Sequence, residues 1–333
     1  MSAREPIDAF LLNPGDLECL KAYLRNLGWI SGEQLVSVCR IGQGNMNLTV
    51  RVRTDQRSFV LKQARPWVEK YPAIPAPVER AAVEAAFYKI VSPFPALASR
   101  MPKLLGFDDH AKVVMLEDLG DNPDLMSLYM QGELSESACG QLVDYLAMLH
   151  RADVPAEHVA IVRNRAMRSL NHEHQYDLPL RQENGLNLDQ ITPGLSALAA
   201  ELKSDPGYCA QVAELGRQYL TDGPALVHGD FFPGSWMLTE GGPTVIDPEF
   251  CFLGPAEYDL GIFLAHLALV RARSLWPLVE TRYSGAADWR LARRFAGAEI
   301  MRRIIGVAQL PVPPDLGQKR AWLELSRRLV CDD

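Results

Sequence analysis

The stretch that decides the fold is VHGDFFPGSWML at residues 227–238, followed by VIDPE at residues 245–249. Both segments begin with apolar residues typical of a short buried strand, and both continue directly into acidic side chains. A Gly-Gly turn at residues 241–242 lies between them. Because a tight hairpin joins strand ends closely, we expect these carboxylates to share one cleft. Neither motif is specific alone, since each also occurs as an ordinary polar turn.

The acidic residues of this cleft predict metal-dependent phosphoryl transfer. Such a reaction needs positioning and charge neutralisation more than covalent chemistry. Asp230 is suited to orient an attacking hydroxyl and to accept its proton. Asp247 and Glu249 are two residues apart, so on an extended segment they share a face and could hold Mg²⁺, which prefers oxygen ligands. Ser235 offers a further oxygen near the metal.

The N-terminal part of the chain predicts a β-meander. Strand-like runs occupy residues 34–41, 48–53 and 58–62, and the Gly-rich turn of residues 42–45 follows the first of them. Lys62 ends the third strand. A helical pattern at residues 16–27 precedes the meander. After it come a proline-rich loop at residues 66–77, a helix at residues 78–91 that contains Glu84, and a buried strand at residues 113–116.

The C-terminal part is predicted to be mostly helical. Helical patterns cover residues 134–150, 211–220, 258–270, 289–310 and 319–329, and short strands are expected at residues 225–228 and 243–247. Residues 117–123 are typical of a turn or linker. We therefore predict an α+β, bilobal fold. Its N-terminal nucleotide-binding lobe would span residues 1–117, and its C-terminal catalytic and substrate-binding lobe residues 118–333.

Composition narrows the classes of partner. The 333 residues are 48% hydrophobic, which is ample for a large core, and the net charge of −7 argues against a nucleic-acid partner. The apolar run at residues 258–270 is too short to span a bilayer, and residues 1–10 show no signal peptide. Six scattered cysteines indicate reduced thiols. We expect a cytoplasmic protein without a membrane partner; its oligomeric state stays open, a homodimer included.

Four stretches carry a resemblance to the aminoglycoside phosphotransferase/choline kinase superfamily, which has the protein-kinase-like fold. They are GQGNMN at residues 42–47, HGDFFPGS at 228–235, DPEF at 247–250 with its continuation to Asp259, and RRIIG at 302–306. Together they reach across most of the chain. Ser235 stands where many relatives have a metal-binding Asn. In this respect the sequence resembles the methylthioribose kinase branch, which has a Ser at that position.

The resemblance implies a role for each candidate site residue. Asp230 would be the catalytic base, and Asp247 and Glu249, with Ser235, would bind Mg²⁺. Gly42, Gly44 and Asn45 would lie over the ATP phosphates, Lys62 would pair with the α/β-phosphates, and Glu84 would hold Lys62. The backbone from Glu117 to Leu119 would bind adenine, and Arg302 and Arg303 would lie near the acceptor sugar and the transferred phosphate.

The residues themselves leave several points open. Glu79 competes with Glu84 as the partner of Lys62. Arg302 and Arg303 are adjacent on a helix and point about 100° apart, so both reach one pocket only if the helix end faces it. His228 is expected to orient the loop without acting as a base. Asp259 lies in an apolar helix, so its carboxylate needs partners, and the resemblance implies that it holds the backbone of that loop. The paired histidines at residues 172 and 174 are expected to face solvent.

Three hypotheses follow. The first is an ATP-dependent kinase for a hydroxyl of a small molecule, with a methylthioribose-like sugar as acceptor. The second keeps the fold but takes choline, another amino alcohol or an aminoglycoside; the arginine pair disfavours such cationic acceptors. The third is a nucleotide-binding pseudokinase module. Its signature would be loss of the base, the metal ligands or the lysine, and the sequence retains them all.

Overall fold

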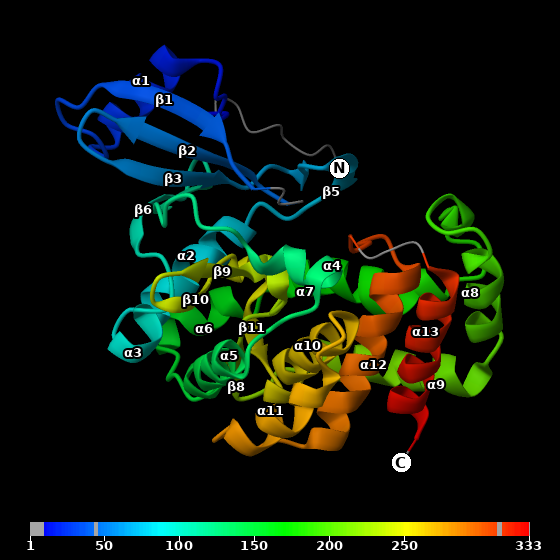
Figure 1. Ribbon diagram of the computed structural model, residues 1–333. Coiled ribbons are helices and arrows are strands. Elements are labelled where there is room, and N and C mark those ends of the chain that lie inside the picture. Colours follow the sequence, from blue (N-terminus) through cyan, green and yellow to red (C-terminus); the bar gives the residue numbers. More distant parts are fainter. Residues whose placement is uncertain (1–9, 43–45, 312–314, 333) are drawn as a thin grey trace. The chain divides into compact units, whose positions relative to one another are not determined.

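The computed structural model describes residues 10–42, 46–311 and 315–332. The chain forms two compact units, unit 1 (Met1–Asp121) and unit 2 (Asn122–Asp333). Figure 1 shows that strands dominate unit 1 and helices dominate unit 2. The expected α+β fold class is therefore confirmed. The assignment of nucleotide binding to residues 1–117, and of catalysis and substrate binding to residues 118–333, stays a prediction.

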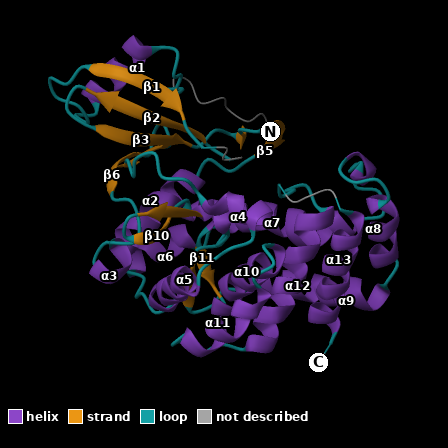
Figure 2. Ribbon diagram, in the orientation of Figure 1, coloured by secondary structure: helices purple, strands orange, loops and turns teal. Residues whose placement is uncertain are grey.

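Unit 1 is built on a five-stranded antiparallel sheet with the strand order β1-β2-β3-β7-β6 (Figure 2). Its strands are β1 (Leu35–Arg40), β2 (Leu48–Thr54), β3 (Ser58–Gln63), β6 (Leu104–Asp108) and β7 (Val113–Glu117). Its helices are α1 (Leu17–Asn26), α2 (Arg80–Val91) and the short α3 (Pro95–Ala98), and a small hairpin is formed by β4 (Trp67–Val68) and β5 (Tyr71–Pro75).

The alternation of side chains along β3 divides its contacts between the two faces of the sheet. Phe59 and Leu61 are fully buried in a cluster that also contains Leu20 and Leu24 of α1. Successive side chains of a strand point to opposite faces, so Lys62 projects away from this cluster. On that side it meets α2. One strand therefore supports the core with one face and presents a cation with the other.

Unit 2 consists of helices around small pieces of sheet. Its α-helices are α4 (Leu128–Gln131), α5 (Glu136–Leu149), α6 (Ala156–Val162), α7 (Arg165–His172), α8 (Leu195–Lys203), α9 (Pro206–Leu220), α10 (Ala256–Leu269), α11 (Trp276–Arg282), α12 (Trp289–Ile305) and α13 (Leu316–Cys331). A π-helical turn, η2 (Glu173–Asp177), continues α7. Two-stranded pairings join β9 (Trp236–Thr239) to β10 (Gly242–Val245), and β8 (Ala225–Val227) to β11 (Phe252–Gly254).

Helix α10, which carries Asp259, packs closely against α12, which carries Arg302 and Arg303. Gly261 makes this approach possible, because a Cβ there would lie 2.5 Å from Cβ of Phe295 and 2.7 Å from the carbonyl oxygen of Ala292. Every residue of α10 from Tyr258 to Leu269 is buried, as the apolar run predicts. Among the residues that the structure describes, no helix is long and apolar enough to cross a membrane.

Most of the predicted elements are confirmed. Helices α6, α7, α8 and α11 were not predicted, and α12 ends at Ile305, whereas the prediction extended to residue 310. The strands differ from the prediction as well. The loop expected at residues 66–77 contains the β4–β5 hairpin. The strand at residues 104–108 was not predicted. The strand at residues 225–227 pairs with residues 252–254 and not with residues 242–245, so the hairpin expected around the Gly-Gly turn is formed by β9 and β10. Short apolar runs indicate strands but cannot indicate which of them pair.

Candidate active site

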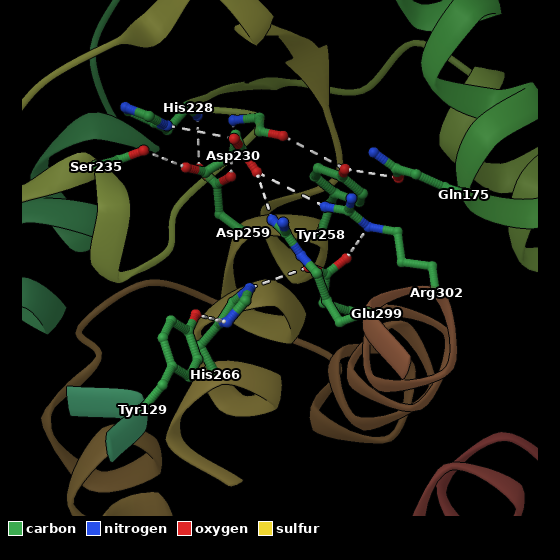
Figure 3. Close-up of polar contacts among 12 residues, drawn as sticks. Tyr129, Gln175, His228, Asp230, Ser235, Tyr258, Asp259, His266, Glu299 and Arg302 are labelled. Atoms are coloured by element: carbon green, nitrogen blue, oxygen red, sulfur yellow. Dashed lines mark hydrogen bonds and ion pairs between the residues drawn. The ribbon is translucent and has the colours of Figure 1, made fainter. Parts of the chain in front are cut away.

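The loop that follows β8 is held by a buried carboxylate from α10. Asp259 accepts the backbone N–H of His228 at 2.6 Å and that of Gly229 at 3.0 Å (Figure 3). It is fully buried, and His150 Nε2 lies 3.2 Å from the same oxygen that His228 uses. Gly229 has φ +87°, and a Cβ there would stand 2.2 Å from the carbonyl oxygen of Phe250. The expected structural role of Asp259 is confirmed.

His228 links the two acidic segments. Its Nε2 lies 2.9 Å from the carbonyl oxygen of Ile246, which can only accept, so this nitrogen carries the proton. Its Nδ1 then accepts the backbone N–H of Asp230 at 3.4 Å. Burial lowers the pKa of His228, against the opposing effect of Asp259, which favours this neutral form. His228 is thus a scaffold between Asp230 and the segment that begins at Asp247.

Asp230 faces two arginines of α12. Arg303 donates an N–H to Asp230 Oδ1 at 3.1 Å, and an Arg302 nitrogen lies 3.7 Å from the same oxygen. The side chain of Asp230 keeps 22% of its surface exposed, so a reactant can reach it. Desolvation by the surrounding protein raises the pKa of Asp230, although both arginines oppose the rise. A carboxylate with a raised pKa is a better proton acceptor than an ordinary aspartate.

Both arginines converge on the site because Glu299 holds them. Glu299 lies one turn earlier on α12; its Oε1 accepts Arg303 Nε at 2.7 Å, and its Oε2 accepts Arg302 Nε. Burial alone would raise the pKa of Glu299, but Arg302 and Arg303 outweigh it and hold that pKa well below its ordinary value. Arg302 and Arg303 are 8% and 6% exposed, so neither is a surface residue.

This arrangement corrects one argument from the sequence. The arginine pair was expected to disfavour a cationic acceptor by repulsion. In the structure, the two positive charges of Arg302 and Arg303 are balanced by the carboxylates of Glu299 and Asp230. The cluster of these four side chains therefore carries no net charge. Repulsion between positive charges gives no reason to prefer a neutral acceptor over a cationic one.

The segment expected to bind Mg²⁺ has an unusual backbone. Asp247 adopts the left-handed conformation at φ +63°, which is uncommon for a residue with a side chain and often marks a functional site. Glu249 is 5% exposed. Asn164, itself left-handed at φ +48°, braces the segment by donating its side-chain amide to the carbonyl oxygens of Glu249 at 3.1 Å and Cys251 at 3.0 Å.

Ser235 is hydrogen-bonded to both acidic segments. Its hydroxyl donates to the carbonyl oxygen of Asp230 at 2.8 Å, which leaves the oxygen lone pairs available. The backbone N–H of Ile246 bonds to the Ser235 carbonyl oxygen at 3.0 Å, so the two segments are tied a second time. Two carboxylates and a hydroxyl suit a hard cation. Across the described ranges, no three His, Cys, Asp or Glu side chains form a metal-binding group, so any bound Mg²⁺ needs further ligands.

Unit 1 contains a buried ion pair. Lys62 Nζ lies 2.7 Å from Glu84 Oε1, and the two side chains are 4% and 1% exposed. The structure thus places Glu84, and not Glu79, beside Lys62. Gly42 is left-handed at φ +68°, as a glycine turn requires. The predicted residues Gly44 and Asn45 lie outside the described residues.

Two arginines of unit 1 fix the segments around this pair. Arg80, fully buried at the start of α2, donates to the Asn47 side chain at 2.8 Å and to the Met46 carbonyl oxygen at 3.0 Å. It therefore ties the end of the Gly-rich turn to the helix of Glu84. Arg51 of β2 bonds to Asp118 at 3.0 Å and to the Gly120 carbonyl oxygen at 2.5 Å.

The segment expected to bind adenine begins at the end of β7. Glu117 accepts the backbone N–H of Lys103 at 3.1 Å through its side chain, and it donates its own backbone N–H to the Lys103 carbonyl oxygen at 2.9 Å. Leu119 follows in the stretch that Arg51 braces. The roles of Glu117 and Leu119 toward adenine stay predictions.

Sequence reasoning missed Glu299 and Arg80. It also missed His266, whose Nε2 lies 3.0 Å from Glu299 Oε1, and Tyr129, whose hydroxyl lies 2.5 Å from His266 Nδ1. Glu299 had a readable signal, because Glu299-x-x-Arg302-Arg303 places a carboxylate three and four residues before two arginines on one helix. The remaining residues gave no such signal, since their partners are distant in the chain. His172 and His174, which were expected to face solvent, are partly exposed and partly buried, and burial lowers the pKa of both.

Comparisons with known proteins were made against families, curated sequences and solved structures. The model of the phosphotransferase enzyme family matches residues 37–295. A methylthioribose kinase of Yersinia pestis (strain Pestoides F) is 30% identical, over 92% of this chain and 90% of that protein. The fold is similar to that of spectinomycin phosphotransferase APH(9)-Ia, solved with ADP and spectinomycin, at TM-score 0.53 and 12% identity over 93% and 97% of the two chains. It is also similar to that of choline kinase LicA of Streptococcus pneumoniae, at TM-score 0.51 and 12% identity over 92% and 97%.

Proposed function

The chain belongs to the phosphotransferase enzyme family and is a kinase for hydroxyl groups of small molecules, and we propose that its acceptor is a methylthioribose-like sugar. The observation that carries the proposal is the 30% identity to a methylthioribose kinase along nearly the whole of both chains. Ser235 supports it through the resemblance, which implies a Ser in the methylthioribose kinase branch where many members of the superfamily have a metal-binding Asn. The convergence of Arg302 and Arg303 on Asp230 supports phosphoryl transfer at this site, but it does not rank one acceptor above another.

The proposed mechanism begins at Asp230. Its carboxylate accepts a hydrogen bond from the acceptor hydroxyl and orients it toward the γ-phosphoryl group of ATP. It takes the hydroxyl proton as the new O–P bond forms and the bond between the γ-phosphorus and the β,γ-bridging oxygen breaks, so that ADP leaves. Arg302 and Arg303 donate N–H groups on the same side as Asp230 and stabilise the charge on the transferred phosphoryl group. Lys62, oriented by Glu84, pairs with the phosphates that remain on the nucleotide.

Mg²⁺ would be held by Asp247 and Glu249 with Ser235. When bound, the cation neutralises charge on the phosphate oxygens. The chain prepares this site in two ways: the left-handed backbone of Asp247 turns the segment sharply, and Asn164 fixes the carbonyl oxygen next to the Glu249 side chain. Both features place the two carboxylates by backbone constraint and not by side-chain packing alone.

A panel of acceptors tests the substrate. Methylthioribose, ribose, choline, homoserine and an aminoglycoside are each incubated with MgATP, and ADP release is measured with identification of the product by mass spectrometry. We expect methylthioribose to give the highest kcat/KM. Choline or aminoglycoside as the preferred acceptor would contradict the proposal. Because the cluster around Asp230 carries no net charge, these cationic acceptors are not excluded by repulsion and the assay can decide between them. Nucleotide binding without consumption in the presence of any acceptor would favour a binding module.

Substitution of Asp247 tests the metal site. Asp247→Asn removes one anionic ligand, so we expect the Mg²⁺ concentration for half-maximal activity to rise by about 10–100-fold. The measurement is a Mg²⁺ titration of activity at saturating ATP. Asp109→Asn is the matched control, because Asp109 is an exposed carboxylate paired with Lys112 in unit 1. An unchanged Mg²⁺ requirement in Asp247→Asn would remove Asp247 from the metal site.

A further inference from the structure

A cleft of about 580 Å³ lies in unit 2, apart from every residue assigned above to catalysis, metal binding or nucleotide binding. Its walls come from the ends of α5 and α9, from the starts of β8, α10 and α12, and from the segment between α11 and α12. We propose that this cleft binds a small phosphate monoester with an apolar substituent. The proposal goes beyond the proposed function and does not depend on the identity of the acceptor.

Arginines outnumber carboxylates at this cleft. Three arginines and three carboxylates line it: Arg151, Arg290, Arg294, Asp222, Glu257 and Asp288. One of these carboxylates, Asp222, also pairs at 3.5, 2.5 and 2.7 Å with three arginines behind the lining: Arg163, Arg165 and Arg168. These nine side chains together carry an excess of three positive charges, although the net charge of the whole chain is −7. Such an excess favours a doubly charged anion over a singly charged one.

The other two carboxylates of the lining are held by backbone contacts. Glu257 Oε1 accepts the backbone N–H of Asp288 at 2.8 Å. Asp288 Oδ1 in turn accepts the backbone N–H groups of Arg290 at 2.9 Å and Leu291 at 3.1 Å, which caps the N-terminus of α12. Both carboxylates are therefore fixed by the backbone, and the positive excess already takes their charge into account.

Two arginines of the lining, Arg151 and Arg294, form no ion pair with a carboxylate among the residues that the structure describes. Arg151 Nε donates to the Ala147 carbonyl oxygen at 2.9 Å. Arg294 Nε donates to the Val330 carbonyl oxygen at 3.4 Å, and a terminal nitrogen of Arg294 donates to the Gln211 side chain. All of these acceptors are neutral, so the two guanidinium charges are available to an anion.

The start of α12 opposes a rule of helix stability. The N-terminus of a helix carries partial positive charge and disfavours cations. Yet Arg290, Arg293 and Arg294 lie in the first six residues of α12, and its first turn contains no acidic residue. Arg290 and Arg294 are four residues apart, so they share a face of the helix, and both line the cleft. A pattern that opposes a local rule is expected where function requires it.

Apolar groups form much of the remaining lining. Pro224, Pro255, Ala256 and Leu291 all line the cleft. Its volume of about 580 Å³ is within the range of ordinary small-molecule sites, about 300–1,000 Å³. A phosphate group alone would fill only a small part of that space, so the ligand is expected to carry an apolar substituent.

His150 and Tyr283 form the wall of the cleft toward Asp259. The Tyr283 hydroxyl lies 2.9 Å from His150 Nδ1, and His150 Nε2 lies 3.2 Å from Asp259 Oδ2. Asp259 is fully buried behind this pair and does not line the cleft. Asp230 and Arg303 do not line it either, so its ligand would be separate from one that contacts Asp230.

Isothermal titration calorimetry of the whole protein with phenyl phosphate tests the proposal. Phenyl phosphate combines a phosphate monoester with an apolar ring, and we expect a Kd on the order of 1 mM for a ligand of this size. Inorganic phosphate lacks the ring and should bind about 10-fold more weakly. Benzoate has the ring but a single charge, and it should also bind more weakly than phenyl phosphate. Absence of binding by phenyl phosphate at concentrations up to about 10 mM would overturn the proposal, and tighter binding of benzoate would overturn the assignment of a phosphate monoester.

Two substitutions locate the bound phenyl phosphate. Arg151→Gln and Arg294→Gln each remove one guanidinium from the lining, and we expect each to weaken binding by about 10-fold. Arg293→Gln is the matched control, because it removes the same charge from the same helix at a residue outside the lining that pairs with Glu280. Its Kd is expected to stay near that of the unmodified protein. Equal weakening in all three variants would indicate diffuse attraction to a positive surface and would contradict a defined site.

Two further comparisons keep the inference testable and separate from the proposed function. Arg151 is exposed, so Arg151→Gln tests the cleft even where Arg294→Gln does not fold, and thermal unfolding checks every variant. Arg303→Gln removes a guanidinium of the candidate active site and is expected to leave phenyl phosphate binding unchanged. Weaker binding in Arg303→Gln with full binding in Arg151→Gln would place phenyl phosphate beside Asp230 and overturn the inference. Binding as expected in a protein inactive on every acceptor would overturn only the proposed function.

Discussion

Replacing Asp230 with asparagine is expected to lower kcat by about 10²–10⁴-fold while the affinity for ATP stays close to that of the unmodified protein. Asparagine keeps an oxygen that can accept the N–H of Arg303, so the geometry of the site is preserved. It cannot take a proton from the acceptor hydroxyl. Steady-state kinetics with the preferred acceptor, together with calorimetric titration of ATP, measure the two quantities.

The pH profile sharpens this test. The base must be ionised to work, so activity falls as the pH drops through the pKa of Asp230. Because desolvation raises that pKa, the fall should begin at a higher pH than for an ordinary aspartate. This limb should vanish in Asp230→Asn. Asp144→Asn is the control, since Asp144 also pairs with an arginine, Arg282, at 2.7 Å on the exposed side of α5. Retained turnover in Asp230→Asn would exclude Asp230 as the base.

Near Asp230, the sequence predicted the roles of those residues whose role follows from the residues next to them in the chain. A carboxylate in a helix as apolar as α10 must find donors, and Asp259 finds them in the backbone of His228 and Gly229. His228 was expected to be structural because a histidine buried in a loop is more often structural than catalytic. The need of Asp259 for partners followed from the cost of burying a carboxylate, whereas the identity of those partners was implied by the family resemblance.

The buried contacts that link Tyr129 to His266 and His266 to Glu299 were not predictable in this way. Tyr129 and His266 are separated by 137 residues, and His266 and Glu299 by 33. Nothing in the spacing of such residues indicates that they meet, because their contact depends on how α4, α10 and α12 pack. The pairing of β8 with β11 was unpredictable for the same reason, because it depends on how the surrounding elements pack. Local sequence patterns indicate the helices and strands, whereas the packing of these elements decides which distant residues come into contact.

The second large effect concerns the ion pair of unit 1. We expect Lys62→Met to abolish most nucleotide binding and to lower the free energy of unfolding of unit 1 by about 3–5 kcal/mol, because Glu84 then stays buried without the lysine. Glu84→Met should have a similar effect on stability. Thermal or denaturant unfolding measures the free energy of unfolding, and ATP titration measures nucleotide binding. Glu79→Met is the control, since Glu79 was the competing partner and the structure pairs Lys62 with Glu84.

The double substitution separates stability from function. Replacing both members of a buried ion pair by apolar residues of similar size is often neutral for stability, whereas removing one member is costly. We therefore expect Lys62→Met/Glu84→Met to recover most of the lost unfolding free energy. ATP binding should not recover, because the phosphates need the ammonium group and not the packing. A double variant that regained both would show that Lys62 only stabilises unit 1. One that regained neither would show that the pair supports the fold through contacts beyond its own charges.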